Sequence, residues 1–114
     1  QRLPRLIGKA RANELIFTVE ALKAQKACEI GLVNRVVHQE ELLPEAEKVA
    51  QLISAKGPVA LTLAKRAIES GYDVPLSEGC KKEIDAFVES FSSQDRDEGI
   101  KAFLEKRKPV FTGK

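Results

Sequence analysis

Apolar residues recur at helical spacing after Glu40, and this periodicity constrains the fold more than any other feature of the chain. An apolar side chain every three or four residues places a stripe along one face of a helix. The first stripe comprises Leu42, Ala46, Val49, Ala50 and Ile53. The second comprises Leu61, Ala64 and Ile68, and the third comprises Leu76, Cys80, Ile84, Phe87, Val88 and Phe91. The pattern predicts successive amphipathic helices, about four or five in the whole chain.

The boundaries of these helices are marked by residues that begin or end a helix. Gly57 and Pro58 are typical of a C′ glycine followed by a proline at the first position of the next helix. The stretch Ser92-Ser93-Gln94-Asp95 offers a serine as N-cap, followed by an acidic residue in the first turn of the next helix. The last helix is predicted to run from there to about Lys108, where cations complement the helix dipole and Pro109 stops the helix.

The beginning of the chain has a weaker pattern. Residues 1–18 predict two short helical pieces broken at Gly8, and a further helix is expected to end with Gly31 as its C′ residue. The β-branched run Val33–Val37 predicts the one strand, which would need a partner strand from elsewhere. Because no cap and no initiating Met stand before Gln1, we expect the chain to be a fragment of a larger protein.

Composition and charge narrow the classes of function. Hydrophobic residues make up 43% and charged residues 32%, as in an ordinary globular domain, and the net charge of +2 is too small for a general nucleic-acid binder. No apolar run approaches the roughly 20 residues that span a bilayer. Cys28, Cys80 and the single His38 form no metal-binding pattern. The two cysteines are expected to be buried and reduced, without redox chemistry.

The residues alone predict no active site. A pair of catalytic carboxylates must face each other in a semi-buried cleft, whereas the acidic residues here fall mostly on polar helix faces. His38 is expected in an exposed loop, and the chain has no glycine-rich phosphate loop.

The C-terminal segment AFLEKRKPVFTGK is the one candidate binding site. Packing of the last two helices would bring Phe87 near Phe103 and Lys106, and the latter two are expected one turn apart on one helix face. An aromatic surface beside an ammonium group suits a ligand with a purine ring and a phosphate. Alternatively, the aromatic residues belong to the core, and Lys106-Arg107-Lys108 is a cation cluster placed by the helix dipole. The pattern alone favours this second interpretation.

Four segments resemble, in order and spacing, the C-terminal part of an enoyl-CoA hydratase/isomerase (crotonase) family protein. They are QRLPRLIGKARANELIFT, ACEIGLVNRVV, AKGPVALTLAKRAIESG and DRDEGIKAFLEKRKPVF. The resemblance implies the C-terminal helical, trimerisation region of the crotonase fold, in which residues 1–37 end the core and residues 38–114 form the C-terminal helical domain. The chain departs from the family at Val19, where a glycine is usual, and at Glu20, where a basic residue is usual. This departure is expected either to alter the loop that enters the next helix or to place a β-branched residue at positive φ with strain.

The resemblance also implies a function. Members of the family process acyl-CoA thioesters, and the enoyl-CoA hydratases are lyases that add water to a 2-enoyl-CoA in fatty-acid β-oxidation. By motif position, Phe87, Phe103 and Lys106 are expected to bind the adenine and the 3′-phosphate of coenzyme A. The catalytic glutamates are expected upstream of this chain, so no catalytic residue is assigned here. The fragment alone is predicted to be inactive.

The expected partners follow from the same resemblance. They are an acyl-CoA substrate and further copies of the protein, in a trimer or a dimer of trimers, with no membrane, no metal, and no cofactor besides the coenzyme A of the substrate. The expected location is the cytoplasm, or the mitochondrial matrix in a eukaryote. Isomerase or hydrolase activity remains open. Further alternatives are a stand-alone, non-catalytic helical interaction module and an RNA-binding crotonase relative, although the cations outside the tail are too scattered for a basic stripe.

Overall fold

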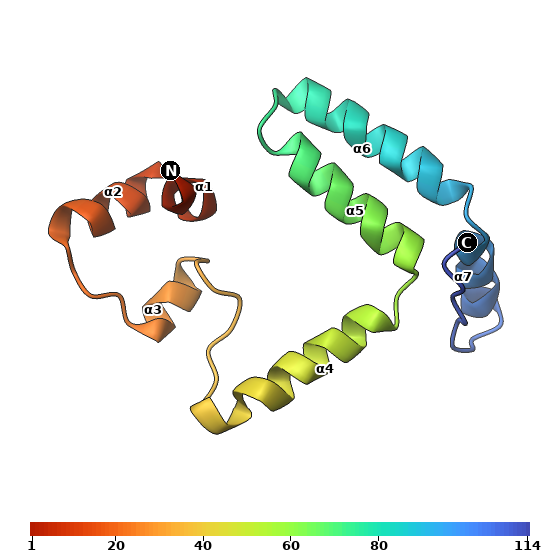
Figure 1. Cartoon of the computed structure of the whole chain (residues 1–114), viewed down its shortest axis with the longest axis horizontal. Coiled ribbons are helices and arrows are strands. Elements are labelled where there is room, and N and C mark those ends of the chain that lie inside the picture. The colour runs from red at the N-terminus through yellow and green to blue at the C-terminus, as the bar shows by residue number, and fades with distance from the viewer. The chain divides into compact units, whose positions relative to one another are not determined.

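The computed structural model describes the whole chain, from Gln1 to Lys114, and shows helices joined by turns and loops (Figure 1). The mainly α class is confirmed. In chain order the elements are α1 (Arg2–Ile7), α2 (Lys9–Thr18), α3 (Ala24–Glu29), the short 3-10 helix η1 (Gln39–Glu41), α4 (Leu42–Ser54), α5 (Pro58–Gly71), α6 (Leu76–Phe91) and α7 (Gln94–Leu104).

The chain divides into two compact units, Gln1–Ala46 and Glu47–Lys114. The division falls within α4, whereas the sequence predicted that the core ends at Val37. That predicted boundary concerns the complete protein, and it stays a prediction.

The strand predicted at Val33–Val37 is not formed, and this part of the prediction is wrong. A strand is stable only where a neighbouring strand takes up its backbone N–H and C=O groups. The chain contains no such neighbour, and Val33 and Val36 are exposed. β-propensity without a partner therefore leaves a loop between α3 and η1.

The first unit is built from short helices that turn at glycine or at a strained residue. Gly8 breaks the helix between α1 and α2 as predicted, with φ +84°. Ile7 and Ala12, on either side of this break, are buried. Val19 ends α2 with φ 52° and ψ 27°, so of the two alternatives for this position the structure shows the β-branched residue in the left-handed region. His38 is exposed in the loop before η1, also as predicted.

The α5–α6 hairpin is the packed centre of the second unit. Pro58 begins α5, as predicted, but Gly57 is the N-cap of α5 with φ −59° and not the predicted C′ glycine of α4, which ends at Ser54. At the other end of the hairpin, two glycines let the helices approach closely, because a β-carbon on Gly79 would stand 3.2 Å from the carbonyl oxygen of Gly71. Leu63 of α5 is buried. The side chains that tie the two helices together along their polar edge are Arg66 with Glu89, and Lys82, whose Nζ donates to the Ser70 carbonyl at 2.9 Å.

The helix α7 begins where the sequence predicted and ends earlier. The Oγ atom of Ser93 accepts a hydrogen bond from the backbone N–H of Arg96 at 3.2 Å, which is the expected N-cap. The last helical residue is Leu104, not about Lys108 as predicted. The reason is that Lys106 takes up a left-handed conformation, with φ 54°, and this turns the chain away from the helix axis.

Much of the apolar stripe on α6 is exposed, because α6 packs extensively against one helix only, α5. The large exposed side chains of this stripe are Leu76, Ile84, Phe87, Val88 and Phe91. The prediction of buried cysteines is wrong: both thiols are free, but Cys80 is exposed on this stripe of α6, and Cys28 on α3 is only half-buried. None of the helices combines the length and the apolar character needed to cross a bilayer.

Candidate functional site

The end of α7 forms a Schellman motif in which a lysine occupies the position usually taken by glycine. The N–H of Lys106 donates to the carbonyl of Phe103 at 3.2 Å, and the N–H of Arg107 donates to the carbonyl of Ala102 at 3.0 Å. These are the two hydrogen bonds that define the motif, with Lys106 as its C′ residue. An L-residue is disfavoured at positive φ because its β-carbon crowds the backbone. The turn at Lys106 therefore needs support from its surroundings.

The side chain of Arg107 supplies contacts on both sides of this turn. Its guanidinium binds the Glu98 carboxylate with two hydrogen bonds, Nη1 to Oε1 at 2.6 Å and Nη2 to Oε2 at 2.9 Å. Its Nε donates to Oε2 of Glu105 at 2.6 Å. The Glu98 carboxylate also accepts the backbone N–H of Val110 at 2.8 Å. This bidentate geometry is the strong form of an arginine–carboxylate contact.

The electrostatics of the pair follow from these contacts. The hydrogen bond from Arg107, the one from the Val110 N–H, and the nearby positive charge lower the pKa of Glu98 to about 2. The two carboxylates in turn raise the pKa of Arg107. Glu98 is therefore ionised at any pH at which the protein would work.

The remaining cations of the cluster are differently placed. The Lys106 side chain is exposed and makes no ion pair, and the same is true of Lys108. Phe103, the one aromatic residue of α7, is 82% exposed. Phe103 and Lys106 lie together through the backbone hydrogen bond of the turn, but not on one helix face as predicted, because α7 ends before Lys106. The structure thus places an accessible ring and an unpaired ammonium group on one sharp turn.

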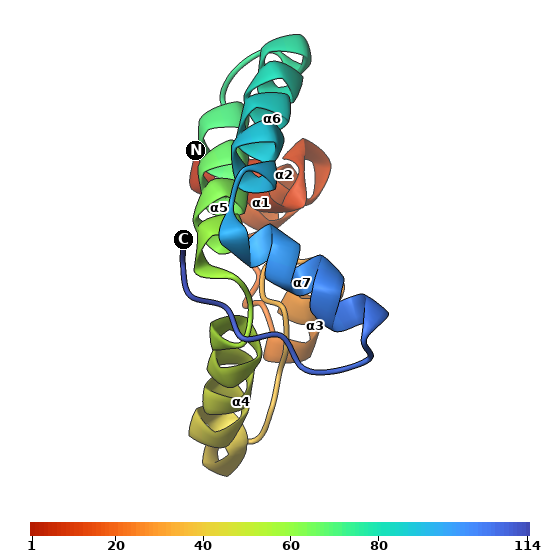
Figure 2. The same cartoon turned by 90° about the vertical axis from the view of Figure 1, so that its right-hand side faces the viewer.

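The tail after this turn folds back onto the start of α7, as Figure 2 shows. The buried carboxylate of Asp95 accepts the backbone N–H of Thr112 at 2.7 Å and that of Gly113 at 3.0 Å. The N–H of Asp95 donates in return to the carbonyl of Lys114 at 3.2 Å. The ring of Phe111 lies near Gly57, where a β-carbon would stand 3.5 Å from its Cδ1 atom. Asp95 therefore acts as a latch for the tail.

Of the three predicted site residues, Phe87 is the one that the structure does not place near Phe103 and Lys106. It lies on α6, it is 63% exposed, and its ring centroid is 5.4 Å from that of Phe91. The guanidinium of Arg96 lies over the Phe91 ring at 4.4 Å from its centroid, a cation–π contact at the joint between α6 and α7. α6 and α7 do not pack extensively against each other, so the packing that the sequence analysis required is not formed.

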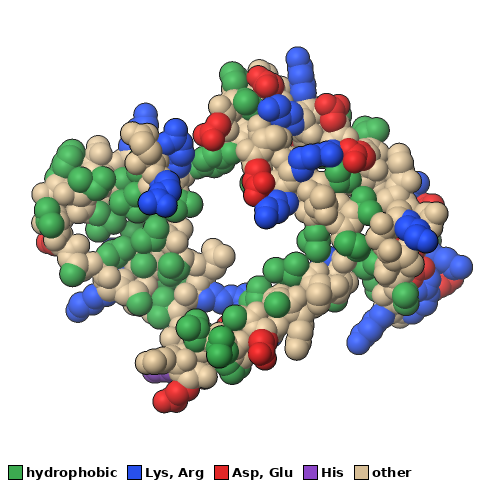
Figure 3. Space-filling model, viewed as in Figure 1, with side chains coloured by type: hydrophobic (Ala, Val, Ile, Leu, Met, Phe, Trp, Pro, Cys, Tyr) green, Lys and Arg blue, Asp and Glu red, His purple; other side chains and the backbone are tan.

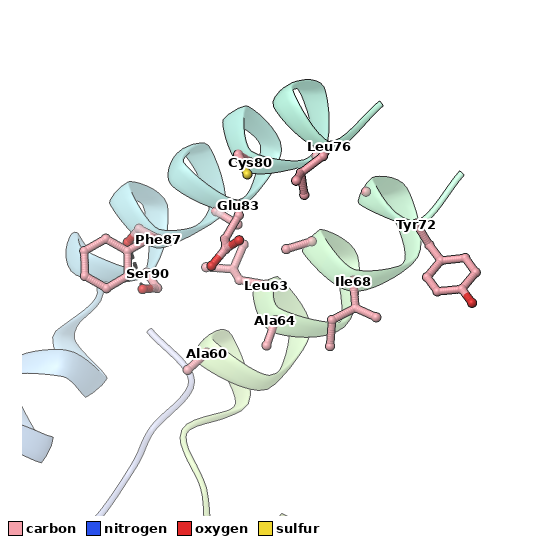
Figure 4. A pocket seen from close by; sticks show the side chains of 14 residues that line it. Ala60, Leu63, Ala64, Ile68, Tyr72, Leu76, Cys80, Glu83, Phe87 and Ser90 are labelled. Atoms are coloured by element: carbon pink, nitrogen blue, oxygen red, sulfur yellow. Dashed lines mark hydrogen bonds between the residues drawn. The ribbon is translucent and has the colours of Figure 1, made fainter. Parts of the chain in front are cut away.

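Phe87 instead borders an open, mainly apolar groove of about 550 Å³ between α5 and α6. Figure 4 shows Leu63 and Glu83 between the two helices, whereas the ring of Tyr72 points away from the groove. The groove lining also includes Ile68, Leu76 and Cys80. The apolar stripes in the sequence predicted an apolar face on each helix. They did not predict a groove, because apolar helix faces were expected to be covered by packing.

Two parts of the site were missed in the sequence: the Glu98–Arg107 pair and the Asp95 latch. Neither has a local signal, because the partners are separated by a turn or by the whole of α7. Elsewhere, no group of three or more His, Cys, Asp or Glu side chains is gathered as a metal site. On the face in Figure 3, acidic and basic side chains are interspersed over the α5–α6 hairpin, without a basic stripe.

Comparison with known proteins places this geometry in context. The family model described as "Enoyl-CoA hydratase/isomerase" matches residues 1–114. A relative named crotonyl-CoA hydratase, from Syntrophomonas wolfei, is 46% identical over the whole chain, which covers 44% of that protein. A short-chain-enoyl-CoA hydratase from Clostridium acetobutylicum is 44% identical over 95% of the chain and 41% of its own length.

Solved structures agree with these relatives. A crystal structure of an enoyl-CoA hydratase from Bacillus anthracis matches the whole chain with a TM-score of 0.93 and 46% identity, and the chain covers 44% of it. The chain thus spans less than half the length of the proteins that it resembles. Its helices correspond to one region of a larger fold.

Proposed function

Because this chain belongs to the enoyl-CoA hydratase/isomerase family, we propose that the whole protein adds water to a 2-enoyl-CoA, in the manner of fatty-acid β-oxidation. The enzyme is then a lyase, and its substrate is an acyl-CoA thioester. The chain described here contributes coenzyme A binding and self-association. The catalytic glutamates belong to the part of the protein that this chain does not include.

The observation that carries the proposal is that the exposed side chain of Lys106, which makes no ion pair, and the exposed ring of Phe103 belong to residues whose backbones are hydrogen-bonded in one turn. An adenine stacks on an aromatic face, and a phosphate attracts an ammonium group and accepts its hydrogen bonds. The two groups lie on one turn, so they suit the nucleotide end of coenzyme A, where an adenine and a 3′-phosphate are close together. The finding that Arg107 is occupied by carboxylates leaves Lys106 and Lys108 as the available cations.

Phe87 fits the same proposal only if it meets the turn at Lys106 in the assembled protein. It lies on a different helix that does not pack extensively against α7, so a second copy of the protein is the simplest way to bring it near a bound nucleotide. The exposed apolar side chains of α6 support self-association, since large apolar patches on a folded surface usually mark an interface. We propose a homo-oligomer, a trimer or a dimer of trimers, located in the cytoplasm or, in a eukaryote, in the mitochondrial matrix.

The proposal is tested on the full-length protein with two thioesters of the same 2-enoyl acid. One carries coenzyme A, and the other carries pantetheine, which lacks the nucleotide. Loss of the conjugated thioester absorbance measures hydration. We expect Phe103→Ala and Lys106→Ala to raise KM for the coenzyme A thioester by about tenfold each, with kcat little changed, because the nucleotide is remote from the reacting bond.

The pantetheine thioester is the control, because neither substitution removes a contact to it. Equal effects on both thioesters would place these residues outside a nucleotide site. Absence of hydration by the wild-type protein would overturn the hydratase assignment itself.

A further inference from the structure

The turn that carries Lys106 is held by contacts in which the Lys106 side chain takes no part. Its backbone lies at φ 54°, where an L-residue is strained. The next residue, Arg107, is bound through its N–H to Ala102 and through its guanidinium to Glu98, one and two turns back along α7. Beyond the turn, the Val110 N–H is bound to the same Glu98 carboxylate at 2.8 Å. The chain is therefore tied to α7 on both sides of Lys106.

The same contacts decide which charges surround the Lys106 ammonium group. Glu98 and Glu105 are the acidic residues of this turn and of the helix face that precedes it, and both carboxylates are bound by Arg107, at 2.6 Å in each case. A carboxylate satisfied by a guanidinium is a weaker competitor for a nearby ammonium group than a free one. Lys106 consequently has no protein partner and stays available for an external anion.

We propose that Glu98 and Arg107 are positioning residues, which hold the left-handed turn at Lys106 and occupy the nearby carboxylates so that its ammonium group is presented to a phosphate. The inference rests on the proposed function, because it takes the 3′-phosphate of coenzyme A as that phosphate. It goes further by assigning a role to two side chains that touch no ligand. Lys106 contacts the phosphate, and Glu98 and Arg107 fix the position of Lys106.

The test compares coenzyme A with 3′-dephospho-coenzyme A, binding to the full-length protein measured by calorimetry. The ratio of the two dissociation constants reports the phosphate contact alone. We expect the wild-type protein to prefer coenzyme A by about tenfold, as for one charge-assisted contact, and Lys106→Gln to bring the ratio close to one. Glu98→Gln and Arg107→Gln, which leave Lys106 in place, are expected to lose most of the preference as well.

Matched variants separate positioning from general damage. Asp97→Asn removes the same charge from the neighbouring residue of α7, whose carboxylate is 72% exposed and pairs only with the adjacent Arg96. This variant is expected to keep the preference. Arg107→Lys keeps the charge but not the two parallel hydrogen bonds, so it is expected to show an intermediate ratio and provides a second variant if Arg107→Gln does not fold.

The outcomes distinguish the two claims. If the wild-type protein shows no preference, the proposed phosphate contact fails, and the positioning role falls with it. If the wild-type protein prefers coenzyme A and Lys106→Gln abolishes the preference, but the Glu98 and Arg107 variants weaken both ligands equally, the contact stands and the positioning role is overturned. A lost preference in those variants, with Asp97→Asn unchanged, supports the inference.

Discussion

Lys106 occupies at the end of α7 the same backbone position that Gly31 occupies at the end of α3. Gly31 has φ +79°, its N–H donates to the Cys28 carbonyl at 3.1 Å, and the N–H of Leu32 donates to the Ala27 carbonyl at 2.8 Å. Lys106, at φ 54°, makes the equivalent pair of bonds. Glycine takes this conformation without crowding, whereas lysine does not. Lysine at this position is therefore strained, and glycine would adopt the same backbone conformation at a lower free energy.

This comparison predicts opposite effects of one substitution on stability and on binding. Lys106→Gly is expected to stabilise the protein by about 1 kcal/mol, because it relieves the positive-φ strain, while it removes the ammonium group from the nucleotide site. Urea unfolding of the full-length protein measures the first effect, and coenzyme A titration measures the second. Lys106→Ala is the control, since it removes the ammonium group and keeps the strain. Equal stability of the two variants would contradict the strain argument.

A second strained position lies in the first unit. Val19 ends α2 at φ 52° with a β-branched side chain that is 85% exposed, so little packing offsets the strain. Val19→Gly is expected to raise the free energy of unfolding by about 1 kcal/mol, and Val19→Ala by clearly less, since alanine keeps the β-carbon. Thermal unfolding of the wild-type protein, Val19→Gly and Val19→Ala under the same conditions measures these differences in stability. A loss of stability in Val19→Gly would show that backbone strain is not what limits stability at this turn.

The α5–α6 crossing predicts contrasting effects of two glycine-to-alanine substitutions. A β-carbon on Gly79 would stand 3.2 Å from the Gly71 carbonyl oxygen, closer than an ordinary contact, so Gly79→Ala is expected to cost about 1–3 kcal/mol. A β-carbon on Gly99 of α7 would stand 3.6 Å from the Phe111 ring, an ordinary contact. Gly99→Ala is then expected to stabilise by up to about 1 kcal/mol, through helix propensity. Chemical denaturation measures both, and the same sign for the two would refute the packing argument.

The Asp95 latch predicts a tail that one substitution releases. The buried carboxylate accepts the N–H groups of Thr112 and Gly113, so Asp95→Ala is expected to destabilise the protein by about 1–3 kcal/mol and to expose the end of the chain. Limited proteolysis followed by mass spectrometry detects the exposed tail. Asp97→Ala removes an exposed carboxylate from the same helix turn and is expected to change neither quantity measurably. Equal cleavage of wild type and Asp95→Ala would mean that the latch is dispensable.

The ionisation of Glu98 predicts how the tail responds to acid. Its pKa is lowered from 4.5 to about 2 by Arg107 and the Val110 N–H, so the folded state binds the proton less readily than the unfolded state does. The stabilisation is therefore fully present above about pH 4.5 and is lost as the pH falls towards 2. Unfolding measured from pH 6 to about pH 2 should show a loss of stability that is smaller in Glu98→Gln. Parallel curves for the two proteins would exclude a contribution from Glu98.

The sequence by itself determined the features that depend on near neighbours along the chain. The apolar stripes predicted α4, α5 and α6, and Gly57, Pro58 and Ser93 marked helix boundaries, because helix periodicity and capping are local. The four matching segments also carried the family.

Only the tertiary structure decided what depends on distant partners. The segment Val33–Val37 has the composition of a strand but no neighbour to pair with, so it is a loop. The end of α7 at Leu104 could not be predicted, because a lysine at C′ gives no helix-stop signal and the turn is held by the contact between Arg107 and Glu98. That contact, like the Asp95 latch, forms only when the tail folds back over α7. Which of the clustered cations is left free is therefore a property of the folded chain.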